Sequence, residues 1–339
     1  MKKYISAILA MATVALYAQE TDKNTEKWSS GRPDGHAPIS VMGDHVHKKG
    51  EWMFSYRYMY MNMEDLKQGS DDASFEDALA DYMVTPTRMP MNMHMLGAMY
   101  ALSDKITLIA MGNYISMEMD HITRMGGTFT TEASGIGDIQ ISGLYQFFNT
   151  NRQSIHGQLG FSIPTGSVTE SDVTPASAPN ETELPYPMQL GSGTFDTRLG
   201  LTYLGQADFI SWGSQLNGLF RFGENERDFR YGNRYSLNNW LGVKTTDWLS
   251  FSVRVEGLIV EEIEGADPNL NPMMVITADT NNSGGTYINS GVGLNTYIPN
   301  GALKNLRLGF EFGFPLYQDL NGIQLKNKET LSFGAQYSF

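Results

Sequence analysis

The sequence contains no cysteine among its 339 residues. This absence excludes disulfide bonds, iron–sulfur clusters, thiolate metal sites and a lipid anchor on cysteine. After residue 18, the chain also lacks any uninterrupted apolar run near the roughly 20 residues that a membrane-spanning helix needs. Basic residues are scarce, since 24 Lys and Arg stand against 37 Asp and Glu for a net charge of −13. No nucleic-acid partner is therefore expected.

The first 18 residues have the composition of a secretory signal. Lys2 and Lys3 precede an apolar run at 5–16, and Ala18 is a small residue suited to cleavage. We predict a signal peptide at 1–18, a periplasmic N-terminal segment at 19–49 and a barrel domain at 50–339. Residues 19–49 could form a disordered leader or fold into the interior of the barrel, and the sequence leaves both alternatives open.

From Gly50 onward the chain repeats one pattern, in which about ten residues of apolar and polar alternation are followed by a turn. Aromatic residues and glycine are abundant, with 17 Tyr, 17 Phe, 5 Trp and 35 Gly. This pattern predicts an all-β fold, a transmembrane antiparallel up-and-down β-barrel of about 12 strands and of the bacterial outer-membrane type. The expected location is the cell outer membrane of a Gram-negative bacterium, in contact with outer-membrane lipids. The predicted strands are 50–61, 89–102, 106–117, 137–147, 154–164, 194–204, 209–222, 235–244, 248–260, 286–298, 306–314 and 331–339.

The last predicted strand is the most diagnostic one. Residues 331–339 alternate between apolar and polar side chains and end at Phe339. A terminal Phe on such a strand resembles the signal that the bacterial barrel-assembly machinery recognises, so this machinery is an expected partner. The strand at 235–244 is the least regular, because Trp240 differs in phase from Leu237 and Leu241.

The connections between strands alternate in length. Short turns at 103–105, 149–153, 205–208, 245–247 and 299–304 alternate with longer connections at 64–88, 120–133, 167–192, 223–230, 261–284 and 318–325. Barrels of this type have short periplasmic turns and longer external loops. The long connections are rich in Asp and Glu. We favour a solvated rim that meets lipopolysaccharide through divalent cations over a specific calcium site.

Four stretches resemble a known family: SGIGDIQISGLYQF (134–147), SIPTGS (162–167), LPYPMQLGSGTFDTRLGLTY (184–203) and PLYQDLNG (315–322). They are similar to outer-membrane transporters related to the channels of the meta-cleavage pathway of phenol degradation. The resemblance covers essentially the whole predicted barrel, and its motifs lie at strand ends and turns. It implies a β-barrel that passes or binds small molecules.

Methionine is concentrated in one part of the chain, since fifteen of the 20 methionines lie between Met42 and Met125. In the strand at 50–61, the aromatic residues Trp52, Phe54 and Tyr56 share one face and are expected to meet lipid. Arg57 lies on the other face, which we take as the lumen because a charge toward lipid is costly. By the same alternation, the residues expected to line the lumen are Met53, Arg57, Met59, Met61, Met99 and Met111.

Two interpretations of these methionines remain open. Methionine is soft and adaptable, so the row could pack a plug or line a path for apolar solutes. Alternatively, thioethers select Cu(I) and Ag(I), and imidazole also suits copper. Five of the six histidines lie in or beside this region, and the motif VMGDHVH (41–47) adds Asp44. The candidate metal ligands are Met42, His45, His47, Met91, Met93, His94, Met95, Met117, Met119 and His121.

The sequence therefore predicts a channel or transporter for a small solute, with a lumen rich in Met and His. A Cu(I) or Ag(I) barrel is the alternative, in which the metal is a ligand or cargo rather than a cofactor. A barrel-based hydrolase is a second alternative. Its requirement would be an acid–base pair at the rim, and the adjacent pair Asp120 and His121 is poorly placed because neighbouring strand residues point to opposite faces. We expect no enzymatic activity.

Overall fold

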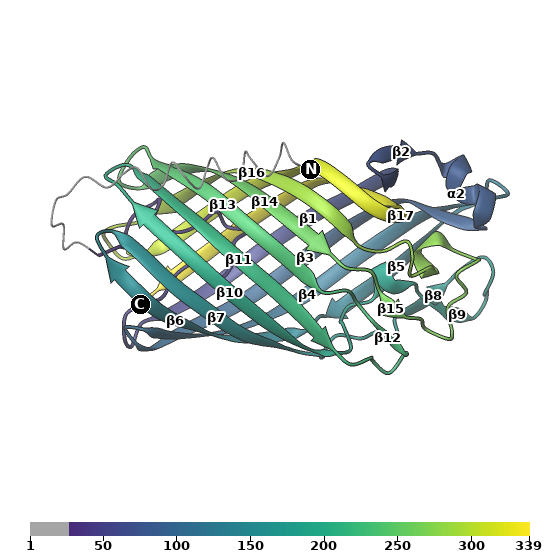
Figure 1. Cartoon of the computed structure of the whole chain (residues 1–339), viewed down its shortest axis with the longest axis horizontal. Coiled ribbons are helices and arrows are strands. Elements are labelled where there is room, and N and C mark those ends of the chain that lie inside the picture. The colour runs from purple at the N-terminus through teal and green to yellow at the C-terminus, as the bar shows by residue number, and fades with distance from the viewer. Residues whose placement is uncertain (1–26) are drawn as a thin grey trace.

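The computed structural model describes residues 27–339, whose strands wind at a tilt around one long barrel axis (Figure 1). The predicted signal peptide at 1–18 lies outside the described residues. The wall consists of β1 (Trp52–Gly69), β3 (Val84–Ser103), β4 (Ile106–Thr123), β6 (Ile139–Thr150), β7 (Gln153–Ile163), β10 (Phe195–Gln206), β11 (Ile210–Phe222), β13 (Arg234–Lys244), β14 (Leu249–Val260), β16 (Gly285–Tyr297) and β17 (Leu306–Ser338).

Each wall strand pairs antiparallel with its neighbours along the chain, and β17 also pairs with β1, which closes the ring. β17 folds back on itself at Gly322, whose φ of +60° suits glycine. Its first arm pairs with β16 and its second arm pairs with β1. Over residues 27–339, the eleven wall strands thus give twelve crossings of the wall. The predicted antiparallel up-and-down barrel of about 12 strands is confirmed.

The two faces of the wall differ as the alternation predicts. On β1, Trp52 and Phe54 are 40% and 50% exposed on the outer surface, whereas Met53 and Arg57 are only 2% and 8% exposed. A charged side chain facing lipid at mid-depth costs about 2–4 kcal/mol, so the register that sends Arg57 inward is strongly favoured. On the terminal strand, Phe339 pairs with Trp52 through both backbone hydrogen bonds and completes the closure.

Strand β13, whose sequence pattern is the least regular, pairs with both neighbours without a break and has one inward aromatic side chain. Trp240 is buried and faces the lumen, while Leu241 is exposed on the outer face. Trp240 lies opposite Gly213 of β11. A Cβ atom on Gly213 would come within 2.1 Å of the Trp240 ring, so the glycine provides the space for the indole.

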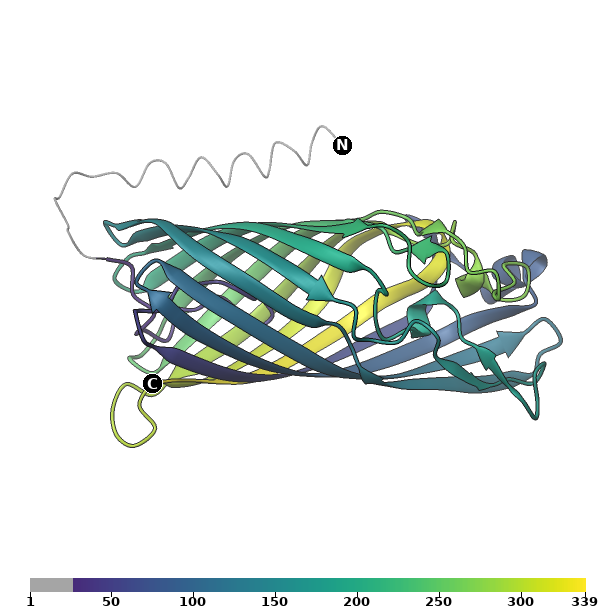
Figure 2. The ribbon, with the colours of Figure 1, turned by 90° about the horizontal axis from the view of Figure 1, so that it is seen from below.

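The remaining elements gather at the end of the barrel away from the C-terminus (Figures 1 and 2). They are β2 (Asp71–Ala73), α2 (Phe75–Asp81), β5 (Thr128–Ile136), β8 (Ser171–Val173), β9 (Glu181–Glu183), η1 (Tyr186–Met188), β12 (Phe229–Arg230), β15 (Glu264–Gly265) and η2 (Ile276–Ala278). Helix α2 starts with a capping box between Ser74 and Asp77. The predicted loop at 120–133 was wrong, because β4 and β5 continue the ladder there and leave only a tight turn. The β-branched residues at the start of β5 favour this extension.

Residues 28–49, which we name the plug segment, fold into the ring at the end that holds the C-terminus (Figure 2), and their last two residues are exposed beside the turn at Asp104. Of the two alternatives for the N-terminal region, the described part folds into the barrel interior. Within the described residues, no helix is long and apolar enough to cross a membrane.

Candidate functional site: the plug and the chamber above it

Inward polar side chains of the wall hold the backbone of the plug segment. This matters because a segment without regular secondary structure must satisfy its buried N–H and C=O groups elsewhere. The bonds are Ser211 Oγ to Asp34 O (2.6 Å), Ser250 Oγ to Pro33 O (2.9 Å), Gln215 Nε2 to Met42 O (3.0 Å) and His47 N to Thr107 Oγ1 (3.0 Å). The plug is therefore fastened to strands on several sides of the barrel.

Apolar contacts and one buried ion pair add to these bonds. The apolar contacts join Trp28, Ala37 and Val41 of the plug to Leu204 and Trp240 of the wall. In the ion pair, Glu311 accepts from Arg254 Nη2 at 2.7 Å and from Ser40 Oγ at 2.8 Å. Glu311 is 2% exposed. This carboxylate therefore joins β14, β17 and the plug segment.

A chamber of about 250 Å³ lies where the plug segment meets the methionine-bearing strands. Ile39, Ser40 and Met42 line it from the plug. The wall residues that line it are the methionines Met59, Met93, Met95 and Met111, together with Arg57, Tyr58, Gly112, Asn113, Gln140, Arg198 and Ser332. The chamber thus combines a soft apolar lining with two guanidinium groups.

Unlike Arg221 and Arg254, the two chamber arginines lack a carboxylate partner. Arg221 lies 3.4 Å from Asp196, and Arg254 lies 2.7 Å from Glu311. Between residues 27 and 339, no Asp or Glu lies within ion-pair distance of Arg57 or Arg198. In addition, Arg57 Nε is buried without a hydrogen-bond partner. Such groups are normally paired, and their presence at a cavity favours an anionic ligand.

On the side of the chamber away from the plug, the methionines form a dry cluster. Met119 is fully buried, and Met89 and Met117 are 3% and 4% exposed. Leu184, Met188 and Leu190, from the connection around η1, pack on this cluster, and Met63, Met91 and Met93 border it. Met93 also lines the chamber. The long connection at 184–190 therefore folds inward and packs on the methionines of β3 and β4.

The predicted lumen residues fall into these groups. Met59, Met111 and Arg57 line the chamber. Met53 and Met99 pack with Ile109 and Leu144 beside Val46 of the plug. Met61 lies directly across from Met91 on β3, so the two side chains share a face of the wall.

The predicted metal ligands do not come together as one set. His94 lies on the outer face, where its Nδ1 is 2.8 Å from Tyr56 Oη, so the structure separates it from Met93 and Met95. The reason is the strict alternation of strand side chains. His121 is buried near the outer end of β4, stacked on Phe129 at 4.6 Å.

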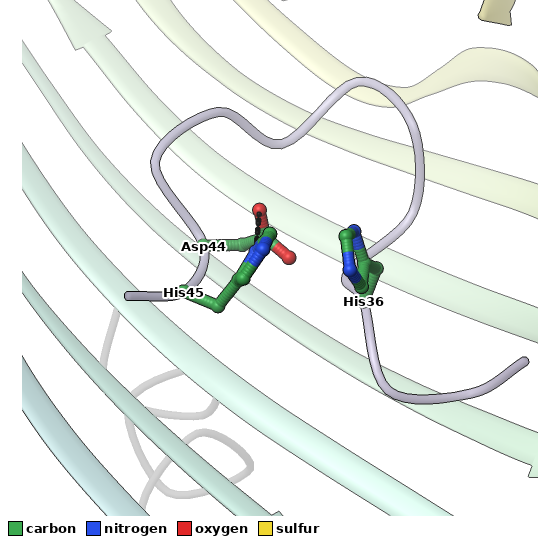
Figure 3. Close-up of side chains that lie close together, drawn as sticks. All are labelled: His36, Asp44 and His45. Carbon is green, nitrogen blue, oxygen red and sulfur yellow. Dashed lines mark ion pairs between the residues drawn. The ribbon is translucent and has the colours of Figure 1, made fainter. Parts of the chain in front are cut away.

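The candidate ligands of the motif at 41–47 also lie in two different places. Met42 lines the chamber, whereas His45 and His47 lie with His36, at ring-centroid distances of 3.9 Å for His36–His45 and 4.6 Å for His45–His47. Figure 3 shows His36, Asp44 and His45 turned toward one another inside the barrel. The sequence indicated the neighbourhood of these histidines but not the loop that brings His36 to His45.

Burial shifts the titration of these groups. Desolvation, with the charge of Arg307, lowers the pKa of His36 well below its ordinary value. Desolvation also lowers the pKa of His47, although Glu51 opposes the shift. Burial disfavours the Asp44 carboxylate, but His45, His36 and the Ala37 amide outweigh it and hold the pKa of Asp44 far below its ordinary value. These shifts favour the neutral imidazole at His36 and His47 and the anionic carboxylate at Asp44.

No protein-family model and no curated protein sequence matches the chain. Its structure resembles that of the COG4313 outer membrane channel from Pseudomonas putida F1, with a TM-score of 0.60 and 14% identity over 88% of this chain and 99% of that one. The NanC porin follows with a TM-score of 0.42 and 7% identity over 82% of this chain and 98% of that one. The KdgM porin has a TM-score of 0.40 and 11% identity over 85% of this chain and 99% of that one.

Only the first of these resemblances is strong enough to be informative, and at that identity it concerns the fold. Together with the closed ring and its apolar outer face, it identifies the chain as a β-barrel of the Gram-negative outer membrane, surrounded by membrane lipid.

Proposed function

We propose that the chain is an outer-membrane channel that admits small organic solutes bearing both an apolar body and a negative charge. The observation that carries this proposal is the chamber, in which Arg57 and Arg198 lack carboxylate partners and methionines supply most of the apolar lining. The plug segment lines one side of this chamber and Met93 joins it to the buried methionine cluster, an arrangement that favours a binding chamber over a wide aqueous pore.

Two interactions would hold such a solute: hydrogen bonds to its negative group and apolar contacts with its body. Guanidinium groups bind carboxylate or sulfonate in charge-assisted hydrogen bonds, each worth about 1.5–3 kcal/mol. Thioether side chains adapt their rotamers to solutes of different shape. The acidic loops at the outer rim oppose this selectivity only weakly, since exposed charges are screened over about 8–10 Å at ordinary salt. The sequence resemblance to channels of phenol degradation also favours small organic solutes.

The test compares two solutes with the same ring and opposite charge. Proteoliposomes of the wild-type chain should take up benzenesulfonate faster than phenyltrimethylammonium. In the double variant Arg57→Met/Arg198→Met, which retains most of the side-chain length, benzenesulfonate uptake should fall about tenfold or more, because a lost charged hydrogen bond exceeds about 1.4 kcal/mol. Uptake of the cation should not fall.

The matched control is Lys105→Met, which removes a positive charge from an exposed turn. Uptake in this variant should equal that of the wild type. Equal uptake of both solutes by the wild type, or no uptake above protein-free liposomes, would refute the proposed solute class.

Binding of Cu(I) or Ag(I) is a second candidate function. The observation in its favour is the gathering of thioethers inside the lumen, where Met89, Met117, Met119 and Met188 are in one buried cluster. Leu184, Leu190 and Ile115 belong to the same cluster, so its packing is equally that of an ordinary apolar core. The two interpretations differ in whether sulfur itself matters.

Replacement of Met91, Met93 and Met95 by Leu separates these interpretations. Met-to-Leu changes keep volume and apolarity and typically cost less than about 1.5 kcal/mol each, so the barrel should still assemble. If the apolar lining is the function, benzenesulfonate uptake should persist within about twofold. Thioether coordination would instead make Cu(I) binding fall in this variant while Zn(II) binding stays unchanged. Titration of the purified barrel with both ions measures the difference.

We also propose that the chain is not an enzyme. Asp120 Oδ1 accepts a hydrogen bond from Thr130 Oγ1 at the surface, while His121 is buried against Phe129, so this acid–base pair is split between faces. Two partners remain proposed. The barrel-assembly machinery would recognise Phe339, and lipopolysaccharide would bind at the acidic rim.

A further inference from the structure

The plug segment gathers three metal-ligating side chains in the barrel interior. One ligand atom from each of His36, Asp44 and His45 lies within 4.8 Å of the others (Figure 3). All three belong to one short loop of the chain, so no movement of the barrel wall is needed to bring them together. His45 is fully buried, and His36 and Asp44 are 9% and 4% exposed.

Several ring nitrogens beside this group have no hydrogen-bond partner. Both nitrogens of His45 and both of His47 are buried in this condition. His45 Nδ1 lies 3.0 Å from Asp44 Oδ1, but the contact lacks hydrogen-bond geometry. His47 Nδ1 lies 3.4 Å from Glu51 Oε2, whereas Nε2 of His47 and Nε2 of His45 have no polar contact. Buried side-chain nitrogens are nearly always satisfied by protein, water or a ligand, so these free nitrogens are unusual. Free imidazole nitrogens of this kind are expected at a site that binds a metal ion.

The surrounding bonds orient the ligands. His36 Nδ1 lies 3.1 Å from Gln336 Oε1, which accepts a hydrogen bond from the Nδ1–H group and so leaves the Nε2 lone pair of His36 free. The Ala37 amide donates to Asp44 Oδ2 at 2.9 Å, and this leaves Asp44 Oδ1 on the side of His45. Supports of this kind accompany metal-bound histidine and carboxylate in proteins.

We propose that His36, Asp44 and His45 form a binding site for a divalent transition-metal ion such as Zn(II), with His47 beside it. The donors are two imidazoles and one carboxylate, which suit zinc and similar ions and do not select Cu(I) or Ag(I). The site contains no methionine, since Met42, the methionine of the same loop, lines the chamber instead. A bound ion would join both ends of the 36–45 loop and hold the plug in its closed arrangement. The proposal does not depend on the solute that the channel admits.

The test is metal titration of the full-length barrel in detergent after treatment with a chelator. The wild type should bind one Zn(II) per chain in competition with a chromophoric chelator. The triple variant His36→Gln/Asp44→Asn/His45→Gln should lose this stoichiometric binding. Gln336→Ala removes only the support of His36, and it should weaken binding roughly 10–100-fold, as loss of such supports does.

His94→Gln is the matched control, because His94 lies on the outer face of the wall. It should bind Zn(II) like the wild type. Heat-modifiable mobility on gels reports whether each variant has assembled. X-ray absorption of the zinc-loaded wild type gives a readout that needs no variant, and it should show nitrogen and oxygen ligands without sulfur. Sulfur ligands, retention of binding in the triple variant, or no binding by the wild type would each overturn the proposal.

Discussion

A variant that lacks residues 28–45 is expected to conduct ions across a planar bilayer at least several-fold better than the full chain. In the full chain, the plug segment fills the lumen at one end and is bonded to inward side chains such as Ser211 and Gln215. Barrels of eight strands are filled by their own side chains, whereas those of sixteen or more enclose aqueous channels, so a twelve-segment ring without its plug should leave a water-filled path.

The barrel should still assemble without these residues, because ring closure depends on the pairing of β1 with β17 and not on the plug. Deletion of residues 174–180 is the matched control. It removes a similar kind of irregular chain between β8 and β9, outside the lumen wall, and should leave conductance near that of the wild type. Equal conductance of the plug deletion and the full chain, with both barrels assembled, would show that the plug does not close the path. Single-channel recording measures both.

The wall was predictable because strand side chains alternate with a period of two. The positions of Arg57, Met53 and Phe339 follow from that period and from the cost of a charge in lipid. The same rule places His94 on the outer face. The prediction of Met91, Met93, His94 and Met95 as candidate ligands of one metal disregards this rule, because His94 alternates with the methionines.

The interior of the site was less predictable, because the plug segment is neither helix nor strand and its side chains follow no regular alternation. Nothing in the alternation tells which residues of an irregular segment meet, so the contact of His36 with His45 depends on the folded loop. Arg198 was missed for another reason. The side chain of Arg198 points inward on β10, on the face opposite to Leu199 and Leu201. The alternation along this strand predicts that direction, but the strand lies outside the methionine-rich region.

The buried ion pair between Arg254 and Glu311 predicts the second large effect, a loss of stability in Glu311→Ala. Removal of one partner of a buried pair typically costs about 3–5 kcal/mol, because the other charge stays buried without compensation. Here we expect a value near the lower limit, about 3 kcal/mol, since Arg254 keeps Glu256 at 3.5 Å and Asn238 at 2.9 Å. Guanidinium unfolding in detergent, followed by tryptophan fluorescence, measures the free energy of unfolding.

The double variant Arg254→Met/Glu311→Leu separates an unpaired charge from a loss of packing. Well-packed apolar replacements of a buried pair are often neutral or stabilising, so the double variant should regain most of the stability that Glu311→Ala loses. It would not restore the acceptor for Ser40, because leucine cannot bind the hydroxyl that now donates to Glu311. The double variant should therefore be stable but leak more current than the wild type, since the plug has lost one of its bonds to the wall. A Glu311→Ala variant within about 0.5 kcal/mol of the wild type, the range of ordinary surface changes, would mean that Glu256 alone compensates Arg254.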